Sequence, residues 1–568
     1  MSASRMKVLI AGGYGVFGGR LAQLLADEPR LVLVIAGRSK AKAEAFCAAL
    51  AAKATLVPAR FDRDGDVLAQ IGALKPDLIA DASGPFQAYG DDPYKLVKAA
   101  LALGINYLDL ADGSGFVRGI SQFDASAKKS GVFVLSGVSS FPVLTAAVVR
   151  QLAVGLIKVD TITGGIAPSP YAGVGLNVIR AISSYAGKPL PLTRDGRTAN
   201  GYGLTGTLRA TIAPPGRLPL KSTLFSLVDV PDLTMLPEVW PGLRSIWMGA
   251  GPVPEVLHRG LIALAWLVRL RVLPSLTVLA PLFHAAINTL RWGEHRGGMF
   301  VRIEGRMADG EQIARSWHLL AEGSDGPMIP SMAIEAIVRR CLIGHAPPAG
   351  ARPALADLEL ADYDALFARR TIFTGLREVP KGGPQKPLFQ RILGSAWDEL
   401  PQPVRDMHYV NGELTAVGTA EVTRGGNPVA RIVAGAFGFP PAGQNVPLTV
   451  HMTSDGNREI WTRQFAGRQF RSVLTAGRGR SEWLLTETFG SVTFAIALVW
   501  SANRLSFVVR RWNILGMPLP LALAPGGDTF ESAQDGRFHF NVEIKLPLFG
   551  LIVRYRGCLN PIPASDYP

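Results

Sequence analysis

Apolar residues along the first 150 positions follow two alternating patterns. Short continuous apolar runs rich in β-branched residues are typical of buried strands, and stretches with apolar residues at helical spacing separate them. Parallel strands need such helical crossovers, so the alternation predicts an α/β fold with a doubly wound parallel sheet. The predicted strands are 7–11, 31–36, 55–61, 77–82, 106–110 and 132–136, and the predicted helices are 16–26, 40–52, 64–74, 91–103 and 121–130.

The pattern changes after residue 150 and predicts a mixed α+β middle domain. Residues 186–256 are rich in Pro and Gly and show little periodicity. The sequence KGGPQKP at 381–387 predicts a linker, and PPAG at 347–350 predicts a loop. The other predicted elements are a strand at 160–167, a hairpin of 298–306 and 312–321 around Asp309-Gly310, and a helix from Pro330 to about Ile343.

Residues beyond 385 follow a period-two pattern, which is typical of half-buried strands. Gly425-Gly426 predicts a hairpin that joins strands at 413–424 and 427–439. A clear alternation of apolar and polar residues covers 538–545. Its apolar members are Phe538, Phe540, Val542 and Ile544, and its polar members are His539, Asn541, Glu543 and Lys545.

Residues 493–500 place large side chains on one face and small side chains on the other. This pattern predicts a C-terminal antiparallel β-rich domain with a strongly curved sheet. The small-residue face has two interpretations, a plain packed core or a concave surface that holds an apolar ligand. The large members are Phe494, Ile496, Leu498 and Trp500, and the small members are Thr493, Ala495 and Ala497.

A chain of 568 residues exceeds the size of one ordinary domain. The changes in pattern predict three domains at 1–150, 151–380 and 385–562. The first would be a dinucleotide-binding domain with a Rossmann doubly wound parallel sheet. The second would be a substrate or dimerisation domain, and the third would be the β-rich domain.

The glycines near the start of the chain form the motif G-x-G-x-x-G between a predicted strand and a predicted helix. In this setting Gly13 allows a tight turn, Gly15 lets the backbone approach a pyrophosphate, and Gly18 brings the helix close to the strand. The N–H groups at the helix start would then face the phosphates. A glycine-rich turn without a ligand is the alternative. The residues predicted to bind the cofactor here are Gly13, Tyr14, Gly15, Val16, Phe17 and Gly18.

The residues after the second strand indicate which dinucleotide is bound. An NAD site usually has an acid about 20 residues after the motif, where it holds a ribose hydroxyl. This chain has Arg38 followed by Ser39 at that place. A guanidinium can fork onto a 2′-phosphate, so we expect NADP(H) rather than NAD. A solvated Arg38 without a ligand is the alternative.

Further cofactor contacts are predicted at the carboxyl ends of the next strands. Ligands of doubly wound sheets bind outside these ends. The fourth strand ends in Ser83-Gly84-Pro85, which we expect along the cofactor near the nicotinamide. Asp62 follows the third strand and is included among the predicted contacts.

The stretch NYLDLAD holds the candidate proton donors, Tyr107, Asp109 and Asp112. Asp109 lies closest to the predicted end of the fifth strand, so Asp109 and Tyr107 are the predicted catalytic residues. Each has a structural alternative, because Tyr107 suits a core and Asp112 suits a helix cap. The histidines and the three widely separated cysteines show no spacing of metal ligands, so no metal is expected.

Composition narrows the class of partner. Hydrophobic residues make up 48% of the chain and charged residues only 18%. The net charge of +14 is spread over all three predicted domains, whereas nucleic-acid proteins more often concentrate it. We therefore expect no nucleic-acid partner. The cysteine usage and the short first apolar run predict a cytoplasmic protein.

The segment 257–292 raises the question of a membrane. It contains 19 residues without an Asp, Glu, Lys or Arg, between Val272 and Leu290. Pro274 and Pro281 interrupt this stretch and arginines precede it, so we do not expect it to cross a bilayer. Either it lies peripherally on the inner face of the cytoplasmic membrane, or it packs on the protein or in a homodimer.

Several motifs in order resemble the saccharopine dehydrogenase NADP-binding family. They are GGYGVFG at 12–18, AGRS at 36–39, ASGPF at 82–86 and AALALGINYLDLAD at 99–112, with looser matches through 296–333. From about 385 the chain resembles the uncharacterised DUF4166 domain. The matching pieces there are WTRQF at 461–465, GMPLPLALAP at 516–525, GRFHFNVEI at 536–544 and YRGCL at 555–559.

The first resemblance implies NADP-dependent oxidoreduction, and the second carries no known chemistry. The apolar composition favours a small apolar substrate, lipid or isoprenoid-like, with reduction of a C=C bond favoured over that of an imine. The alternative is a non-catalytic, NADP-binding, membrane-associated protein that handles lipids. The sequence lacks an evident catalytic set, which supports the alternative, whereas the intact glycine motif supports the enzyme.

Overall fold

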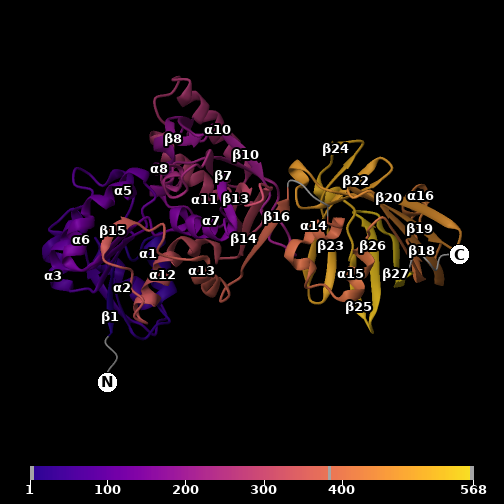
Figure 1. The fold of residues 1–568 in the computed structure, drawn as a ribbon, viewed down its shortest axis with the longest axis horizontal. Coiled ribbons are helices and arrows are strands. Elements are labelled where there is room, and N and C mark those ends of the chain that lie inside the picture. The colour runs from indigo at the N-terminus through magenta and orange to yellow at the C-terminus, as the bar shows by residue number, and fades with distance from the viewer. Residues whose placement is uncertain (1–4, 381–385, 563–568) are drawn as a thin grey trace. The chain divides into compact units, whose positions relative to one another are not determined.

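The computed structural model describes residues 5–380 and 386–562, which form two compact units (Figure 1). The first unit contains the chain up to Leu208, then Leu224–Ser316 and Ala321–Ile372. The second contains Arg209–Thr223, Trp317–Leu320 and the described chain from Phe373 onward. The predicted domain bounds stay a prediction. The predicted linker at 381–387 falls mostly outside the described residues.

A parallel sheet forms the N-terminal part of the first unit and confirms the predicted doubly wound fold. Its strand order is β15-β6-β5-β4-β1-β2-β3, so the order reverses between β1 and β4. Such a reversal opens a crevice at the carboxyl ends of the strands. The strands are β1 (Met6–Ala11), β2 (Leu31–Gly37), β3 (Thr55–Arg60), β4 (Leu78–Asp81), β5 (Asn106–Asp109), β6 (Phe133–Ser136) and β15 (Gly350–Pro353).

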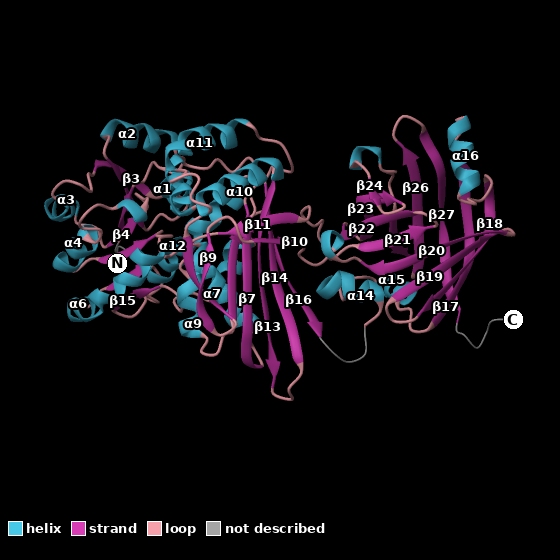
Figure 2. Ribbon diagram, turned by 90° about the horizontal axis from the view of Figure 1, so that it is seen from above, coloured by secondary structure: helices cyan, strands magenta, loops and turns pink. Residues whose placement is uncertain are grey.

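Helices cover both faces of this sheet, as Figure 2 shows. The strands are therefore buried on both sides, and Leu9, Ile10 and Leu33 have no exposed surface. A late helix, α12 (Ile329–Cys341), packs beside α1, where the Ser331 hydroxyl donates to the Phe17 carbonyl. The other helices of this part are α1 (Val16–Leu25), α2 (Lys40–Ala49), α3 (Val67–Leu74), α4 (Lys95–Leu103), α5 (Ser114–Gly119), α6 (Asp124–Ser130) and α7 (Thr145–Leu152).

The predicted loop at 347–350 leads directly into an additional strand of the sheet. Gly350 to Pro353 form β15, which pairs in parallel with β6 from Phe133 to Ser136. A strand of four residues carries too little periodicity to be recognised, and the neighbouring prolines favour a loop. The sheet therefore contains a strand that the sequence pattern does not predict.

A second sheet, of mixed direction, has the strand order β10-β11-β12-β7-β13-β14-β16. It confirms the predicted strand at 160–167, the predicted hairpin strands and the mixed class of this region. The stretch 186–256, which shows little periodicity, contains several short strands and a helix. The elements from Leu156 to Pro380, apart from those described above and below, are β7 (Leu156–Ala167), α8 (Leu176–Tyr185), β8 (Pro189–Arg194), β9 (Arg197–Tyr202), β10 (Thr207–Ala210), β11 (Thr223–Leu227), α9 (Asp232–Val239), β12 (Ser245–Ala250), β13 (Arg296–Met307), β14 (Gln312–Glu322), α13 (Leu360–Phe367) and β16 (Ile372–Pro380).

The apolar segment 257–292 folds as two helices, α10 (Glu255–Arg269) and α11 (Ala280–Thr289). No helix among the described residues has the length and apolar character that crossing a membrane requires. Trp266 keeps 40% of its surface exposed, whereas Leu276 is completely buried. Membrane contact by this segment stays a prediction.

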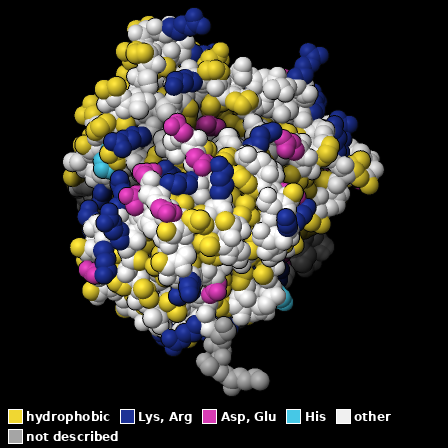
Figure 3. Space-filling view, turned by 90° about the vertical axis from the view of Figure 1, so that its left-hand side faces the viewer, with side chains coloured by type: hydrophobic (Ala, Val, Ile, Leu, Met, Phe, Trp, Pro, Cys, Tyr) yellow, Lys and Arg dark blue, Asp and Glu magenta, His cyan; other side chains and the backbone are white. Residues whose placement is uncertain are grey.

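Basic side chains do not gather in a stripe on the face of the molecule in Figure 3. On that face lysines and arginines are scattered among acidic and apolar side chains. The expected absence of a nucleic-acid partner stays a prediction.

An antiparallel sheet forms most of the second unit, as predicted. Its order is β22-β21-β20-β19-β18-β17-β27-β26-β25-β23-β24, and β22 also pairs with β23, which closes the sheet on itself. Its strands are β17 (Glu413–Arg424), β18 (Gly443–Ser454), β19 (Arg458–Phe465), β20 (Arg468–Ala476), β21 (Leu485–Phe489), β22 (Val492–Ser501), β23 (Arg504–Ile514), β24 (Met517–Pro518), β25 (Phe530–Gln534), β26 (Arg537–Leu546) and β27 (Gly550–Ile562).

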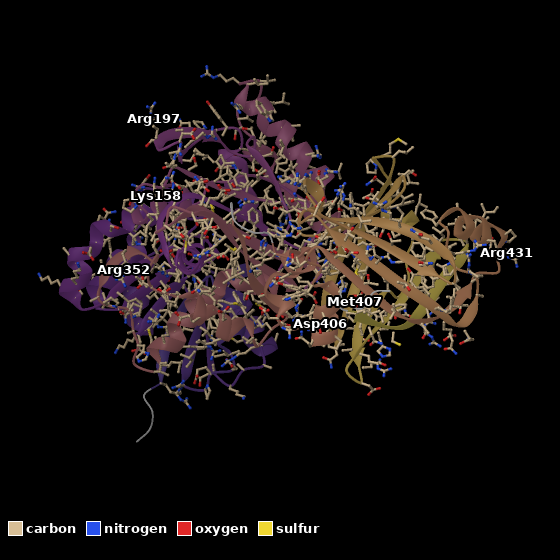
Figure 4. All side chains as sticks on the ribbon, turned by 45° about the vertical axis from the view of Figure 1, so that its right-hand side comes forward. Lys158, Arg197, Arg352, Asp406, Met407 and Arg431 are labelled. Atoms are coloured by element: carbon tan, nitrogen blue, oxygen red, sulfur yellow. The ribbon has the colours of Figure 1, made fainter. Side chains whose placement is uncertain are left out.

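The interior of the closed sheet is a packed core that includes α14 (Leu388–Leu393) and α15 (Gln402–His408). Met407 of α15, labelled in Figure 4, is buried in this core. The large side chains Ile496 and Leu498 of β22 also belong to it. His408 stacks on the ring of Phe389, lies next to that of Trp461 and forms a hydrogen bond with Glu531.

The predicted hairpin around Gly425-Gly426 is wrong in its second half. Residues 413–424 form β17, but Pro428–Ala436 form a helix, α16. The Asn427 side chain accepts a hydrogen bond from the backbone N–H of Val429, which caps the helix, and Pro428 occupies its first turn. Ala430 and Ala434, four residues apart, are its buried face. The cap and the helical spacing overrule the glycine turn signal.

Candidate functional site

The glycine loop lies between β1 and α1, where three of its glycines are required by packing. Gly12 has φ +75°, and a Cβ there would lie 2.8 Å from the Ala82 carbonyl oxygen. A Cβ on Gly13 would lie 2.8 Å from the Ile10 carbonyl oxygen, and one on Gly18 would collide with Gly12. The left-handed residue of the turn is thus Gly12, whereas the sequence analysis assigned the turn to Gly13.

Gly15 differs from these three glycines. It is exposed, and a Cβ there would approach only the Gly12 carbonyl oxygen, at 3.0 Å. It precedes α1, whose first turn has no acidic residue and no side-chain cap. The first N–H groups of a helix have no intrahelical acceptor, so they remain available to an anion above Gly15.

The next residues of the site surround the end of β2. The Tyr14 hydroxyl accepts a hydrogen bond of 3.0 Å from the Ser39 N–H, and its ring lies against Gly37. The Ser39 hydroxyl accepts a hydrogen bond from the Lys42 N–H and caps α2. Arg38 is exposed and forms no hydrogen bond or ion pair with another described residue. A free guanidinium therefore stands beside the glycine loop.

Asp62 follows β3 at the same edge of the sheet. The preceding residue, Phe61, donates its N–H to the Gly37 carbonyl, which ties this loop to the end of β2. The Asp62 N–H donates to the Gln70 side chain, and the Asp62 carboxylate accepts from the Asp64 N–H. The structure thus places Asp62 near Arg38 and Ser39, as the sequence pattern predicts for one edge of a parallel sheet.

The Ser83-Gly84-Pro85 loop lies directly against the glycine loop. A Cβ on Gly12 would lie 2.9 Å from the Ser83 Cα, which shows how closely the two loops pack. Asn177 of α8 donates its side-chain N–H to the Gly84 carbonyl at 3.2 Å. The crevice at the reversal of strand order is therefore bounded by the glycine loop, this loop and α8. That these predicted residues contact a cofactor stays a prediction.

Asp81, the last residue of β4, is a buried acid that the sequence analysis did not single out. Its carboxylate accepts hydrogen bonds from the Ser83 N–H at 3.0 Å, the Tyr89 hydroxyl at 3.2 Å and the Tyr107 hydroxyl at 3.4 Å. Burial raises the pKa of Asp81, although the hydrogen bonds from Ser83 oppose this. These contacts fix the loop after β4 and leave Asp81 without access to a ligand.

The two predicted catalytic residues lie just behind the surface of the crevice. Asp109 is completely buried and accepts hydrogen bonds from the Gly137 N–H, the Ala111 N–H and the Ser136 hydroxyl at 2.8–3.0 Å. Burial raises its pKa to about 7. Tyr107 is equally buried and belongs to the core. Their burial favours a positioning role, and their catalytic role stays a prediction.

Asp112, the third candidate, lies in a polar cluster that faces the crevice. Asp112 is exposed to solvent, but many protein atoms lie close to its carboxyl group. The resulting loss of solvation raises the pKa of Asp112. The Gln87 side chain donates to its carboxylate at 2.9 Å. The Asp229 carboxylate lies close enough to raise the pKa of Asp112 further. We refer below to Gln87, Asp112, Ser114, Tyr185 and Asp229 as the polar cluster.

Two members of the polar cluster come from the middle of the chain. Asp229 follows β11 and accepts a hydrogen bond of 2.9 Å from the Ser114 hydroxyl. Tyr185 is the last residue of α8 and lies near Asp112 and Asp229. Burial and the two acids raise the pKa of Tyr185. The sequence pattern does not indicate either residue, because Asp229 lies within 186–256 and Tyr185 next to it, where periodicity is weak.

The arrangement can bind an anionic ligand and transfer a proton. Main-chain donors at the glycine loop and the free Arg38 suit phosphate groups. The hydroxyl and carboxyl groups of the polar cluster hold protons beside the Ser83-Gly84-Pro85 loop. The described residues contain no group of three or more His, Cys, Asp or Glu side chains arranged to hold a metal ion.

Comparisons with known families identify the C-terminal region. Residues 400–559 match the model of a domain of unknown function, DUF4166. This confirms the resemblance stated for that part of the chain. No curated protein sequence matches the chain.

Several solved structures are similar in fold to about two thirds of the chain. One is apo saccharopine dehydrogenase (L-Glu forming) from Saccharomyces cerevisiae, with a TM-score of 0.46, 12% identity, and coverage of 66% of this chain and 100% of that chain. GenD2 from gentamicin A biosynthesis, in complex with NAD, gives a TM-score of 0.32, 10% identity, and coverage of 67% and 98%. The dehydrogenase MviM from Clostridium difficile gives a TM-score of 0.30 and 11% identity, with coverage of 64% of this chain and 99% of that chain.

Proposed function

We propose that the chain is an NADPH-dependent oxidoreductase. The observation that carries this proposal is the difference among the loop glycines. Packing on several sides fixes Gly12, Gly13 and Gly18, whereas exposed Gly15 has one close neighbour, the Gly12 carbonyl oxygen, 3.0 Å from where a Cβ would lie. Gly15 stands beside the first N–H groups of α1, and a glycine there lets the backbone approach a pyrophosphate.

Arg38 supports NADPH rather than NADH. It stands where an acid would hold the ribose of NAD, and no described residue pairs with it. The start of α2 adds Lys40 and Lys42 on exposed positions. A 2′-phosphate would be attracted to this group of cations, and the guanidinium can bind it with two parallel hydrogen bonds.

The residues of the crevice suit a hydride transfer followed by protonation. The bound nicotinamide supplies the hydride. The Ser83-Gly84-Pro85 loop is rigidly held by Asp81 and Asn177, so it can orient the ring. The hydroxyl of Tyr185 lies near both acids of the polar cluster and is the other candidate proton donor. Asp112 has a raised pKa and retains a proton at a higher pH than an ordinary carboxyl.

The surroundings favour a small apolar substrate, with reduction of a C=C bond preferred and an imine second. Two carboxyl groups, Asp112 and Asp229, disfavour an anionic substrate. The rings of Phe86, Tyr89 and Phe116 pack together directly after the loop, with centroids 4.6 Å and 5.1 Å from that of Phe86. These buried rings form an apolar core directly behind the loop, which suits a lipid or isoprenoid-like group better than a charged one.

The second candidate is a non-catalytic, NADP-binding protein that handles lipids at a membrane. The exposed apolar side chains of the segment from α10 to α11 favour it. They include Val256, Trp266, Leu270, Val272, Val278 and Leu282. Both candidates share the cofactor site and differ in whether hydride leaves it.

Deuterium transfer separates the two candidates. The purified chain is incubated with NADPH that carries deuterium on the reactive carbon, together with a total lipid extract. An oxidoreductase of this class moves deuterium into an extracted apolar product, which mass spectrometry detects. The Gly15→Val variant serves as the control without cofactor. Tight NADPH binding without any transferred deuterium would favour the non-catalytic candidate.

A further inference from the structure

The second unit contains a pocket of about 760 Å³ that is lined by arginines and small polar side chains. All the residues that line it belong to the second unit. None of the described lining residues is acidic. The arginines are Arg391, Arg458, Arg478 and Arg511, and the other lining residues used below are Asn457, Thr475, Thr486, Thr493, Ala495 and Asn513.

The strand register explains how the pocket forms. One row of paired residues crosses β19, β20, β21, β22 and β23. In this row Arg458 pairs with Thr475, Thr475 with Thr486, Thr486 with Ala495, and Ala495 with Arg511. Small side chains thus occupy the middle of the row and an arginine stands at each end. A ligand can approach the strands in the middle and contact a cation on either side.

The row lies on the face of β22 that is opposite to the packed core. Successive side chains of a strand point to opposite faces, so Thr493, Ala495 and Ala497 share one face while Ile496 and Leu498 enter the core. Part of the small-residue face is covered, since Ala495, Ala497 and Leu484 form a buried cluster against which Leu218 and Val508 pack. The covered part bounds the pocket on one side.

The charges of the pocket are only partly neutralised by protein. Arg458 forms an ion pair with Asp455 at 2.8 Å, and Arg391 donates to the Gly456 carbonyl and lies near Glu459. Arg511, by contrast, is half-buried and forms no hydrogen bond or ion pair with another described residue. Burial lowers the pKa of Arg511, and the positive charges of Arg480 and Arg209 lower it further.

Keeping an unpaired cation half-buried beside two other cations is costly unless an anion joins them. We propose that this pocket binds a small molecule whose phosphate or carboxylate groups contact Arg458 and Arg511 at the two ends of the row. Arginine suits both groups because its fork matches two oxygens at once. The side chains of Asn457 and Asn513, which line the pocket beside the row, would bind further oxygens.

Calorimetric titration of the full chain with sodium pyrophosphate and with sodium citrate tests the proposal. We expect one of the two anions to bind, and the tighter one identifies phosphate or carboxylate as the preferred group. Arg511→Gln and Arg458→Gln should each weaken this binding by roughly tenfold or more, the scale of a hydrogen bond between charged groups. Arg431→Gln is the matched control, because Arg431 is an exposed arginine of α16 outside the pocket (Figure 4).

The glycine loop is a second place where pyrophosphate could bind, so the Gly15→Val variant is titrated in parallel. Binding that survives Gly15→Val but weakens in Arg511→Gln assigns the site to the second unit, whether or not the proposed function holds. Binding that is lost only in Gly15→Val would overturn the proposal, as would equal binding by the unmodified chain and Arg511→Gln. Should Arg511→Gln fail to fold, the exposed Arg458 decides the outcome by itself.

Discussion

The parallel sheet of the first unit and the closed antiparallel sheet of the second gather polar side chains in different ways. In the first, the glycine loop, Arg38, Asp62, Ser83 and the polar cluster all lie beyond the carboxyl ends of strands. In the second, five of the pocket residues, with Arg458 and Arg511 at the ends, occupy one row across five neighbouring strands. The first site therefore belongs to an edge of a sheet, and the second belongs to a face.

The direction of the strands explains this difference. All strands of a parallel sheet end at the same edge, so residues that follow different strands meet there without regard to register. Neighbouring strands of an antiparallel sheet end at opposite edges, so only cross-strand register brings their residues together. An edge site can thus be recognised from strand ends in a sequence, whereas a face site requires the pairing.

The largest expected effect concerns the edge itself. Gly15→Val should abolish NADPH binding, because a β-branched side chain would occupy the space proposed for the pyrophosphate. Fluorescence titration with NADPH measures the binding, and circular dichroism verifies the fold. Gly72→Ala of α3 is the control, since a Cβ there meets no atom within 4 Å. Retained binding in Gly15→Val would mean that the loop is only a turn.

The second prediction compares Asp112 of the polar cluster with Asp92, an exposed acid outside it. Asp112→Asn should slow deuterium transfer from NADPH by roughly 10²–10⁴-fold, the usual contribution of a proton donor, while NADPH still binds. Asp92→Asn, which removes an exposed acid paired with Lys98, should leave the rate unchanged. An unchanged rate in Asp112→Asn would exclude it as the proton donor and leave Tyr185 as the remaining candidate, which Tyr185→Phe tests.

Asp109 should affect stability and its dependence on pH. An ordinary aspartate ionises near pH 3.8, but burial raises the pKa of Asp109 in the folded chain to about 7. Between these values the folded chain binds more protons than the unfolded chain. Raising the pH through this window therefore lowers the free energy of unfolding, by up to about 1.4 kcal/mol per pH unit.

Asp109→Asn removes this titration, so its melting temperature should fall less steeply between pH 5 and pH 7 than that of the unmodified chain. Asp232 also has a pKa raised by burial to about 7, and it contributes equally to both proteins. Thermal denaturation at a series of pH values gives the two slopes. Parallel slopes would show that Asp109 does not titrate in this window.

Arg38 should set the preference between cofactors. Arg38→Ala should remove roughly 1.5–3 kcal/mol of the preference for NADPH over NADH, the contribution of a hydrogen bond between charged groups. Calorimetric titration of both proteins with both cofactors measures the difference. Lys53→Ala provides an exposed cation away from the site for comparison. An unmodified chain that binds both cofactors equally would contradict the assignment of Arg38.

The smallest effect is expected outside both sites, at the segment from α10 to α11. Binding to liposomes should rise with the fraction of anionic lipid and weaken in high salt, with about 1 kcal/mol from each surface arginine. Val278→Asp should reduce flotation, because Val278 is 87% exposed there. Leu548→Asp, at an equally exposed position of the second unit, is the control. A chain that never floats would place this segment in an ordinary protein contact.

Sequence pattern was most informative where local signals agree with each other. The strands and helices of the first 150 residues are recognisable because each strand is a continuous apolar run between helical crossovers. It was least informative at 186–256, where short strands alternate with glycines and prolines. At 427–439 the sequence pattern predicts a strand, because Gly425-Gly426 indicates a turn. The cap at Asn427 favours the helix that the structure has there.

Periodicity and chain order are enough to predict the parallel sheet and its glycine loop. They also predict the edge of the sheet at which Arg38 and Ser83 lie. Which acids are accessible depends on the tertiary structure. Asp109 and Asp112 lie three residues apart, but Asp109 is buried and bound by backbone donors, whereas Asp112 is exposed. The tertiary structure also brought Tyr185 and Asp229 to Asp112, and Arg458 to the row of Arg511. Contacts between distant segments depend on packing and register, and the local pattern of a chain predicts neither of them.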